Sequence, residues 1–268
     1  MAMAKKLEGA GLRGQIAGKT ALSTVGKTGS GLTYRGYDVK DLAEHCQFEE
    51  VAHLILKGHL PNGAELATYK RKLKGLRGLP KALKEVLERI PAAAHPMDVL
   101  RTGCSFLGNI EPEADFSQQQ DATDRMLAVF PSIICYWYRF SHDNLRIDTE
   151  TDDDSIGAHF LHMLRGGKPN ALHERVMNVS LILYAEHEFN ASTFTARVCA
   201  STLSDMHSCV TGAIGSLRGP LHGGANEAAM EMIERFTSPD HAEQEMLGML
   251  ARKDKIMGFG HAIYAESD

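Results

Sequence analysis

The chain has 268 residues, of which 43% are hydrophobic and 24% charged, and its formal net charge is −5. This composition predicts a folded core, arranged as one large domain or two smaller ones, and argues against disorder. The negative balance gives no general basic surface for nucleic acid or an anionic membrane, although a local basic pocket for a phosphate-bearing ligand stays open.

The sequence shows no sign of export or of membrane insertion. No apolar run reaches the roughly 18 residues of a spanning helix, and "MAMAKKLEGAGLRG" at the N-terminus has no apolar core long enough for a signal peptide. The five cysteines include no CxxC motif, which is typical of free thiols in a reducing compartment rather than of disulfides or structural zinc. We therefore expect a cytoplasmic protein without nucleic-acid or membrane partners.

The N-terminal region predicts a small β-hairpin, and the rest of the chain predicts helices. Residues 20–37, "TALSTVGKTGSGLTYRGY", place two short apolar runs around a glycine-rich turn. Beyond them, apolar residues recur at helical spacing, and we expect about ten helices. Strands and helices do not alternate, so the expected fold class is all-α with a small hairpin, without a parallel sheet.

Three later segments carry more specific predictions. The acidic triplet in "TDDDS" at 151–155 precedes a helical pattern, which indicates a solvated helix start with a favourable helix dipole. Residues 172–187 are apolar nearly all round, which predicts a buried helix. From Ser192 to Leu217, apolar residues follow at intervals of three to five, so a further helix should bury one face.

Several motifs are too weak to carry chemistry alone. Gly-Lys-Thr occurs at 18–20 and 26–28, but Arg13 and Ala21 stand where a phosphate loop needs glycine. The stretch "GFGHAIY" at 258–264 lacks the last glycine of a dinucleotide fingerprint. His159 and His162 could share a helix face, but no third ligand has metal-site spacing. We therefore expect packed histidines and no metal.

Three other histidines stand at the ends of predicted elements. His187 ends the helix before "NAST", His222 precedes a helix in "GPLHGGANE", and His261 lies in the glycine-rich "GFGHAIY". Functional groups concentrate in such connecting segments. Each histidine alone could be structural, but the three together favour a site.

The position of His222 predicts a neutral imidazole. At the positive end of the following helix, the macrodipole disfavours imidazolium by up to ~2 kcal/mol in a partly buried setting. The pKa could then fall by about one unit from roughly 6.5. A neutral ring can donate a hydrogen bond to a carbonyl oxygen as an enolate develops, which points to carbon-acid chemistry.

The histidine motifs together resemble those of the citrate synthase family. "GPLHGGANE" and "GFGHAIY" are similar to its two catalytic histidine motifs, and "HEFNAST" to its oxaloacetate-binding motif, in the family's order. The segments "YRGYDVKDLAEHCQFEEVAHL", "HPMDVLRTG" and "ETDDDSIGAHFLHML" are most similar to the bacterial 2-methylcitrate synthases within it.

The resemblance implies a two-domain helical homodimer. Residues 1–222 would form the N-terminal part of the large domain, and residues 223–268 the beginning of the small domain. The implied reaction condenses propanoyl-CoA with oxaloacetate and water to 2-methylcitrate and CoA. The coenzyme A thioester is a substrate, and no cofactor or metal is expected.

The resemblance also implies a role for each matched residue. His222 would stabilise the thioester enol, and His261 would protonate or polarise the oxaloacetate carbonyl. His187 would bind oxaloacetate, with Asn190 shaping that pocket. The CoA site would be lined by the backbone of Ile256, Met257, Gly258, Phe259 and Gly260.

Two features depart from the family pattern. Ala265 stands where many relatives carry a basic residue near the CoA phosphates. Asp268 matches the first residue of an Asp-Pro-Arg motif whose arginine grips oxaloacetate. The resemblance implies that this arginine, the catalytic aspartate and the C-terminal helices would follow. We therefore expect a chain that is truncated and inactive by itself.

Two alternative functions remain open. A citrate synthase that prefers acetyl-CoA differs by one methylene of substrate, worth only ~1–3 kcal/mol in an apolar pocket. A helical binding or scaffolding module without catalysis would fit the absence of the aspartate and arginines from these residues, but it leaves the three histidine motifs unexplained.

Overall fold

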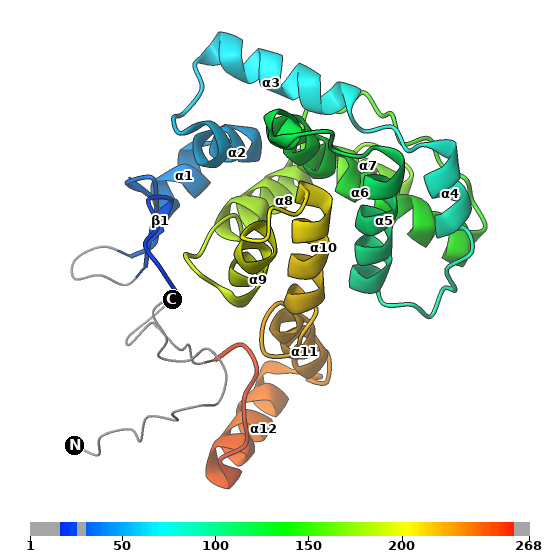
Figure 1. Ribbon diagram of the computed structural model, residues 1–268. Coiled ribbons are helices and arrows are strands. Elements are labelled where there is room, and N and C mark those ends of the chain that lie inside the picture. Colours follow the sequence, from blue (N-terminus) through cyan, green and yellow to red (C-terminus); the bar gives the residue numbers. More distant parts are fainter. Residues whose placement is uncertain (1–16, 26–30, 260–268) are drawn as a thin grey trace.

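The computed structural model describes residues 17–25 and 31–259, and twelve α-helices dominate that part of the chain (Figure 1). This confirms the predicted all-α fold class, with two helices more than the expected ten. One short 3-10 helix, η1, precedes α6. The helices are α1 (Val39–His45), α2 (Phe48–Lys57), α3 (Gly63–Gly75), α4 (Lys81–Leu87), α5 (Pro96–Ile110), η1 (Phe116–Gln118), α6 (Gln119–Asp143), α7 (Ile156–Arg165), α8 (Ala171–Leu183), α9 (Ala191–Ala200), α10 (Met206–Leu217), α11 (Gly224–Ile233) and α12 (Pro239–Arg252).

The predicted hairpin is present and gains a third strand. β1 (Ser23–Thr24), β2 (Thr33–Tyr34) and β3 (Tyr37–Asp38) form an antiparallel sheet in the order β1-β2-β3. Arg35 and Gly36, with φ of 47° and 91°, form the two-residue turn between β2 and β3. Positive φ at both positions suits the twist of a tight hairpin.

Helix α6 lies at the centre of the fold and contributes to two apolar cores. Its Val129, Ile133 and Trp137 pack with α4 and α5, and all three side chains are buried. Its Ala128 lies in a second cluster with the sheet, α1, α2, α3 and Ile182 of α8. Helix α6 therefore joins the two cores.

The prediction of a buried helix at 172–187 is wrong for α8. Within the described residues only Ile182 of this helix is buried, whereas Leu172 is 69% exposed and Val176 56% exposed. Helix α8 contacts α1, α2 and α7, which cover one side of it. Leu172, Val176 and Leu183 are not covered by these helices and remain exposed.

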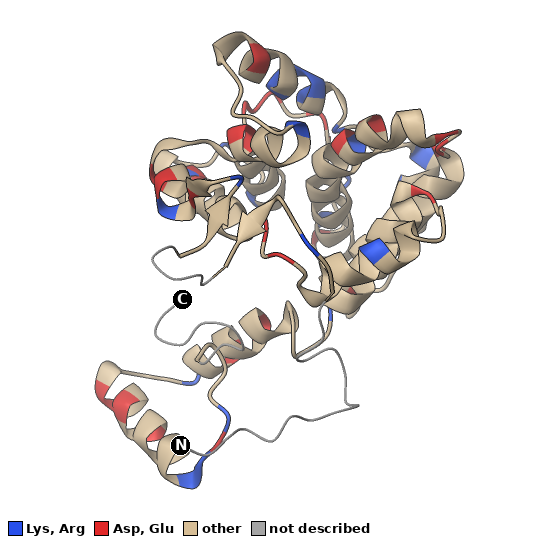
Figure 2. Cartoon of the chain, turned by 60° about the vertical axis from the view of Figure 1, so that its left-hand side comes forward, with Lys and Arg blue, Asp and Glu red and all other residues tan. Residues whose placement is uncertain are grey.

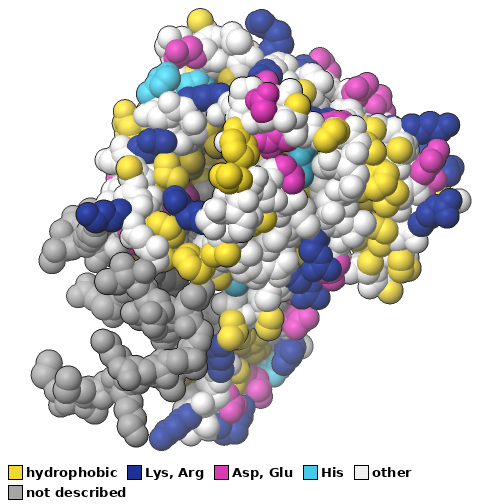
Figure 3. Space-filling model, viewed as in Figure 1, with side chains coloured by type: hydrophobic (Ala, Val, Ile, Leu, Met, Phe, Trp, Pro, Cys, Tyr) yellow, Lys and Arg dark blue, Asp and Glu magenta, His cyan; other side chains and the backbone are white. Residues whose placement is uncertain are grey.

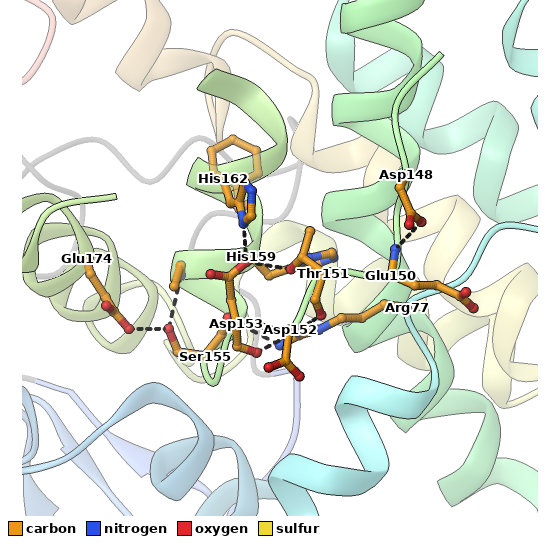
Figure 4. Close-up of polar contacts among 12 residues, drawn as sticks. Arg77, Asp148, Glu150, Thr151, Asp152, Asp153, Ser155, His159, His162 and Glu174 are labelled. Atoms are coloured by element: carbon orange, nitrogen blue, oxygen red, sulfur yellow. Dashed lines mark hydrogen bonds and ion pairs between the residues drawn. The ribbon is translucent and has the colours of Figure 1, made fainter. Parts of the chain in front are cut away.

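The acidic segment before α7 is solvated in part, as predicted, because Asp152 and Asp154 are exposed. Ser155 caps α7 by accepting a hydrogen bond from the Ala158 N–H at 3.0 Å, so the predicted helix start is confirmed. Asp153, however, is buried. Arg77 is also buried, and its guanidinium donates to the carbonyl oxygens of Thr151, Asp153 and Ser155 at 3.1, 2.7 and 3.3 Å (Figure 4). The segment is thus bound into the protein by a residue more than seventy positions earlier in the sequence.

His159 and His162 both belong to this hydrogen-bonded network. The buried His159 ring lies 3.1 Å from the Ser132 hydroxyl and 2.9 Å from the Thr151 hydroxyl. Nδ1 of His162 lies 2.7 Å from a carboxylate oxygen of Asp153 (Figure 4). In the part of the chain that the structure describes, no group of three or more His, Cys, Asp or Glu could hold a metal ion.

Burial should make His159 a source of acid sensitivity. It lowers the pKa of His159 from 6.5 to about 3, and the charge of Arg77 acts in the same direction. Between these pH values the unfolded chain binds a proton that the folded chain excludes. The free energy of unfolding should therefore be highest above pH 6.5, and this group should cost roughly 1–3 kcal/mol as the pH falls to 4.

His159→Gln should remove most of that pH dependence, because glutamine does not titrate. Urea unfolding of both proteins from pH 7 to pH 4 measures the difference in slope. The same substitution at the exposed His142 is the matched control and should leave the acid dependence in place. An equal slope in wild type and His159→Gln would contradict the assignment.

Helices α11 and α12 extend away from the other helices (Figure 1). Two side-chain contacts tie the start of α11 to the main body. The amide of Asn226 donates to the Tyr184 hydroxyl at 2.8 Å, and Nε2 of His95 lies 3.0 Å from a Glu227 carboxylate oxygen. The domain boundary after residue 222 stays a prediction.

Charges of both signs are spread over the helices (Figure 2). On α3, for example, Lys72 pairs with Asp121 and Asp124 at 2.7 and 2.6 Å. Across the described residues, no helix combines the length and apolarity that a membrane span requires.

Candidate active site

His222 lies in a tight turn between α10 and α11. The helix predicted after it is confirmed and begins at Gly224, and the His222 carbonyl accepts from the Ala225 N–H at 3.0 Å. A Cβ atom at Gly223 would lie 2.7 Å from the carbonyl oxygen of Leu217, and one at Gly224 would lie 3.0 Å from that of Gly219. Both glycines are therefore needed for the close backbone approach that presents the imidazole.

Ser192, in the first turn of α9, holds the His222 ring. The Ser192 N–H donates to Nε2 at 3.3 Å, and the Ser192 hydroxyl lies 2.9 Å from the same nitrogen. An amide N–H can only donate, so we use this contact to assign the lone pair to Nε2 and the proton of the neutral ring to Nδ1. With this assignment, the contacts among the described residues leave an Nδ1–H donor for a ligand.

Burial lowers the pKa of His222 below its ordinary value of 6.5. This direction agrees with the neutral imidazole that the sequence predicts. The physical cause in the structure is loss of solvent around the ring, and the additional effect of the α11 dipole stays a prediction. Near pH 7 the neutral form therefore dominates, as a hydrogen-bond donor to a developing enolate requires.

The structure brings the segment containing His187 and Asn190 to the same place as His222. Oδ1 of Asn190 caps α9, accepting from the Thr193 N–H at 3.0 Å and lying 2.7 Å from the Ser192 hydroxyl. Asn190, Ser192 and His222 thus form a continuous set of polar contacts. His187 lies three residues before the capping asparagine and is half-buried.

The remaining predicted site residues follow α12. Ile256 and Met257 are half-buried, whereas Phe259 is 70% exposed. A Cβ at Gly258, which has a φ of 90°, would lie 3.4 Å from the Ala229 Cβ, so this segment approaches α11. Gly260 and His261 lie outside the described residues, and their predicted roles are untested.

Ser192 is the site residue that sequence reasoning missed. It belongs to the "HEFNAST" motif, from which only His187 and Asn190 were assigned roles. A detectable signal was present, because Asn190 before a helical pattern predicts an N-cap and places Ser192 in the first turn. Backbone N–H groups there lack partners within the helix.

A sequence model of the family described as "Citrate synthase, C-terminal domain" matches residues 11–268. The chain belongs to the citrate synthase family. The resemblance inferred from three short motifs therefore extends over nearly the whole chain.

Two bacterial relatives show where in the citrate synthase family the chain lies. It is 76% identical over 268 residues to the 2-methylcitrate synthase of Shewanella oneidensis, covering 100% of this chain and 72% of that protein. It is 44% identical over 259 residues to the 2-methylcitrate synthase of Mycobacterium tuberculosis, covering 96% of this chain and 66% of that protein. The chain thus matches roughly two thirds or more of the length of these relatives.

Solved structures of citrate synthases share the fold. The citrate synthase of Thermotoga maritima superposes with a TM-score of 0.82 at 36% identity, over 95% of this chain and 68% of that one. The Thermoplasma acidophilum citrate synthase, in a ternary complex with carboxymethyl coenzyme A and oxaloacetate, superposes with a TM-score of 0.85 at 31% identity. The match again covers 95% of this chain and 68% of that one.

Proposed function

We propose that this chain acts as a 2-methylcitrate synthase, which condenses propanoyl-CoA with oxaloacetate and water to give 2-methylcitrate and free CoA. The observation that carries the proposal is the His222 ring, held by Ser192 at Nε2 and leaving its Nδ1–H for a carbonyl oxygen. The 76% identity with the Shewanella oneidensis enzyme supports propanoyl-CoA as the acyl donor.

In the first step, His222 would donate its Nδ1–H hydrogen bond to the thioester carbonyl oxygen. A base takes a proton from the α-carbon of the propanoyl group, and negative charge develops on that oxygen. A preorganised donor stabilises this charge more than the neutral ground state. The resemblance assigns the base to an aspartate that would follow Asp268.

In the second step, the α-carbon bonds to the carbonyl carbon of oxaloacetate. His261 would give a proton to the carbonyl oxygen, which becomes the hydroxyl of the product. His187 and Asn190 would hold oxaloacetate. Because Oδ1 of Asn190 is occupied by the α9 cap, its amide nitrogen is the group left for a substrate carboxylate. Water then hydrolyses the thioester and releases the CoA thiol.

We propose that the CoA portion lies along residues 256–260. Gly258 provides a backbone without a side chain close to α11. The reaction as written needs no cofactor beyond the thioester substrate, because imidazoles polarise both carbonyls. A reaction that consumes propanoyl-CoA would serve propionate catabolism through a methylcitrate cycle.

We propose that the protein forms a homodimer through the exposed apolar side chains of α8 and α9 and the turns that follow them. Val176 and Tyr184 at α8 are 56% and 71% exposed, and Val198 and Leu203 at α9 are 52% and 74% exposed. Figure 3 shows hydrophobic side chains exposed at several places on one face of the molecule. Exposed apolar groups of this kind are typical of protein interfaces.

A cytoplasmic location is a further proposal, supported by five free cysteines.

Acyl-donor preference tests the proposed function. The assay uses an extended chain, in which these 268 residues are fused to the part of the Shewanella oneidensis relative that lies outside the match. Release of free thiol in the presence of oxaloacetate gives kcat/KM for each acyl-CoA. We expect propanoyl-CoA to be favoured roughly 10–200-fold over acetyl-CoA, the range that one methylene supports. A preference for acetyl-CoA would identify a citrate synthase, and no thiol release with either would favour a binding module.

A further inference from the structure

The loop between α8 and α9 is tied to the N-terminal strand by one buried hydroxyl. Ser23 of β1 is only 4% exposed, and its hydroxyl donates to Oε1 of Glu186 at 3.0 Å. The hydroxyl oxygen of Ser23 also accepts a hydrogen bond from the Glu188 backbone N–H at 3.0 Å. Ser23 therefore holds the residues on both sides of His187, although 163 positions separate it from Glu186 in the sequence.

The backbone of this loop adopts a conformation that needs support. Glu188 has a φ of 53°, in the left-handed region that non-glycine residues rarely occupy. Holding a residue there costs free energy, and surrounding contacts must compensate for it. The hydrogen bond from the Glu188 N–H to Ser23 is one such contact, and it acts directly on the residue after His187.

Further contacts fix the rest of the loop. A Cβ atom at Gly18 would lie 3.1 Å from the Phe189 ring, so the backbone at Gly18 packs closely against that ring. The Arg197 guanidinium lies 4.6 Å from the centre of the same ring. Burial raises the pKa of Glu186, whose carboxylate has Ser23 as its side-chain hydrogen-bond donor. Gly18 and Ser23 thus both lie against the loop that carries His187.

We propose that Ser23 and Glu186 are positioning residues for substrate binding, which fix the backbone of His187 and thereby set the affinity for oxaloacetate. This inference rests on the proposed function, because His187 binds oxaloacetate only if that function holds. Neither side chain needs to touch the substrate. Each acts by restricting the loop before the dicarboxylate arrives, which lowers the entropy cost of binding.

Steady-state kinetics of the extended chain tests the role of Ser23. Ser23→Ala should raise the KM for oxaloacetate roughly tenfold, because a hydrogen bond to a charged group is lost in the loop. The KM for propanoyl-CoA and kcat should change less than about twofold. Thr24→Ala is the matched control, since the Thr24 hydroxyl pairs with that of Thr33 within the same sheet. It should leave the KM for oxaloacetate unchanged.

Two variants at Glu186 test the other half of the contact. Glu186→Gln keeps an acceptor for the Ser23 hydroxyl, whereas Glu186→Ala removes it. The KM for oxaloacetate should therefore rise less in the glutamine variant than in the alanine variant. Equal effects of the two substitutions would overturn the role of this hydrogen bond, even if Ser23→Ala did not fold.

A binding measurement separates this inference from the proposed function. Oxaloacetate should raise the Tm of the extended wild-type chain and of Thr24→Ala by similar amounts, and that of Ser23→Ala by less. Equal stabilisation of all three proteins would overturn the positioning role, as would a common rise in KM for both substrates. Absence of thiol release from the wild type would instead count against the proposed function, while the Tm shifts would still report on the loop.

Discussion

Replacing His222 with alanine should lower the turnover of the extended chain roughly 10²–10⁴-fold, the usual contribution of a positioned acid or base. The physical reason is the loss of the Nδ1–H donor that the proposed mechanism directs at the thioester carbonyl. Ser192 already occupies Nε2, so the proton on Nδ1 is the part of the ring available for chemistry. Turnover is measured as oxaloacetate-dependent release of CoA thiol.

Oxaloacetate affinity provides the internal control for this substitution. The KM for oxaloacetate should change much less than kcat, because His187 and the arginines implied by the resemblance hold that substrate. His142→Ala, at an exposed position on α6, should retain normal turnover. Near-normal turnover in His222→Ala would remove this residue from the mechanism.

The 268 residues expressed alone should not catalyse the condensation. They cover 72% of the length of the Shewanella oneidensis enzyme. The resemblance places the base that removes the α-proton, and the arginines that neutralise the dicarboxylate, in the remainder. Without a base, His222 can polarise the carbonyl but cannot form the enol.

Exposed apolar side chains on α12 strengthen this expectation. Leu247 and Leu250 are 59% and 61% exposed within the described chain, and surface of this kind promotes association. The assay compares thiol release by the 268-residue chain and the extended chain at equal concentration. A comparable rate from the shorter chain would show that the essential groups lie within these residues.

The fold was predictable from local patterns wherever those patterns also determined the packing. Two short apolar runs around a glycine-rich turn in residues 20–37 predicted the hairpin. The helical spacing of apolar residues predicted the helices. The third strand, Tyr37 and Asp38, follows directly after the two-residue turn at Arg35 and Gly36, and no separate apolar run marks it in the sequence. The burial of α8 was predicted wrongly, because an apolar sequence favours burial but does not determine which element covers the helix.

The acidic triplet shows how a distant residue can limit a local interpretation, which holds for the exposed Asp152 and Asp154 but not for Asp153. "TDDDS" alone predicts a solvated helix start, and Ser155 confirms the helix start. The buried Asp153 is held by Arg77, which donates a hydrogen bond to its carbonyl oxygen. No sequence pattern near residue 153 predicts this contact. A non-local hydrogen bond of this kind becomes visible only once the chain is folded.

The candidate site was predictable to a similar degree. The sequence correctly placed His222 directly before a helix, and the two glycines that follow it allow the close backbone contacts of the turn. The link between His222 and Ser192 spans thirty residues and depends on how α9 and α10 pack together. The link between Ser23 and Glu186 is longer still, so motif spacing could not reveal it.

The Arg77 contacts also have a consequence for engineering and for evolution. Connecting segments usually accept insertions, because few interactions depend on their length. Residues 151–155 differ, since one buried guanidinium binds three of their carbonyl oxygens and fixes their spacing. An epitope tag, a grafted loop or a deletion placed here would disturb the protein as a core substitution does. This connection should consequently diverge more slowly than its position between two helices suggests.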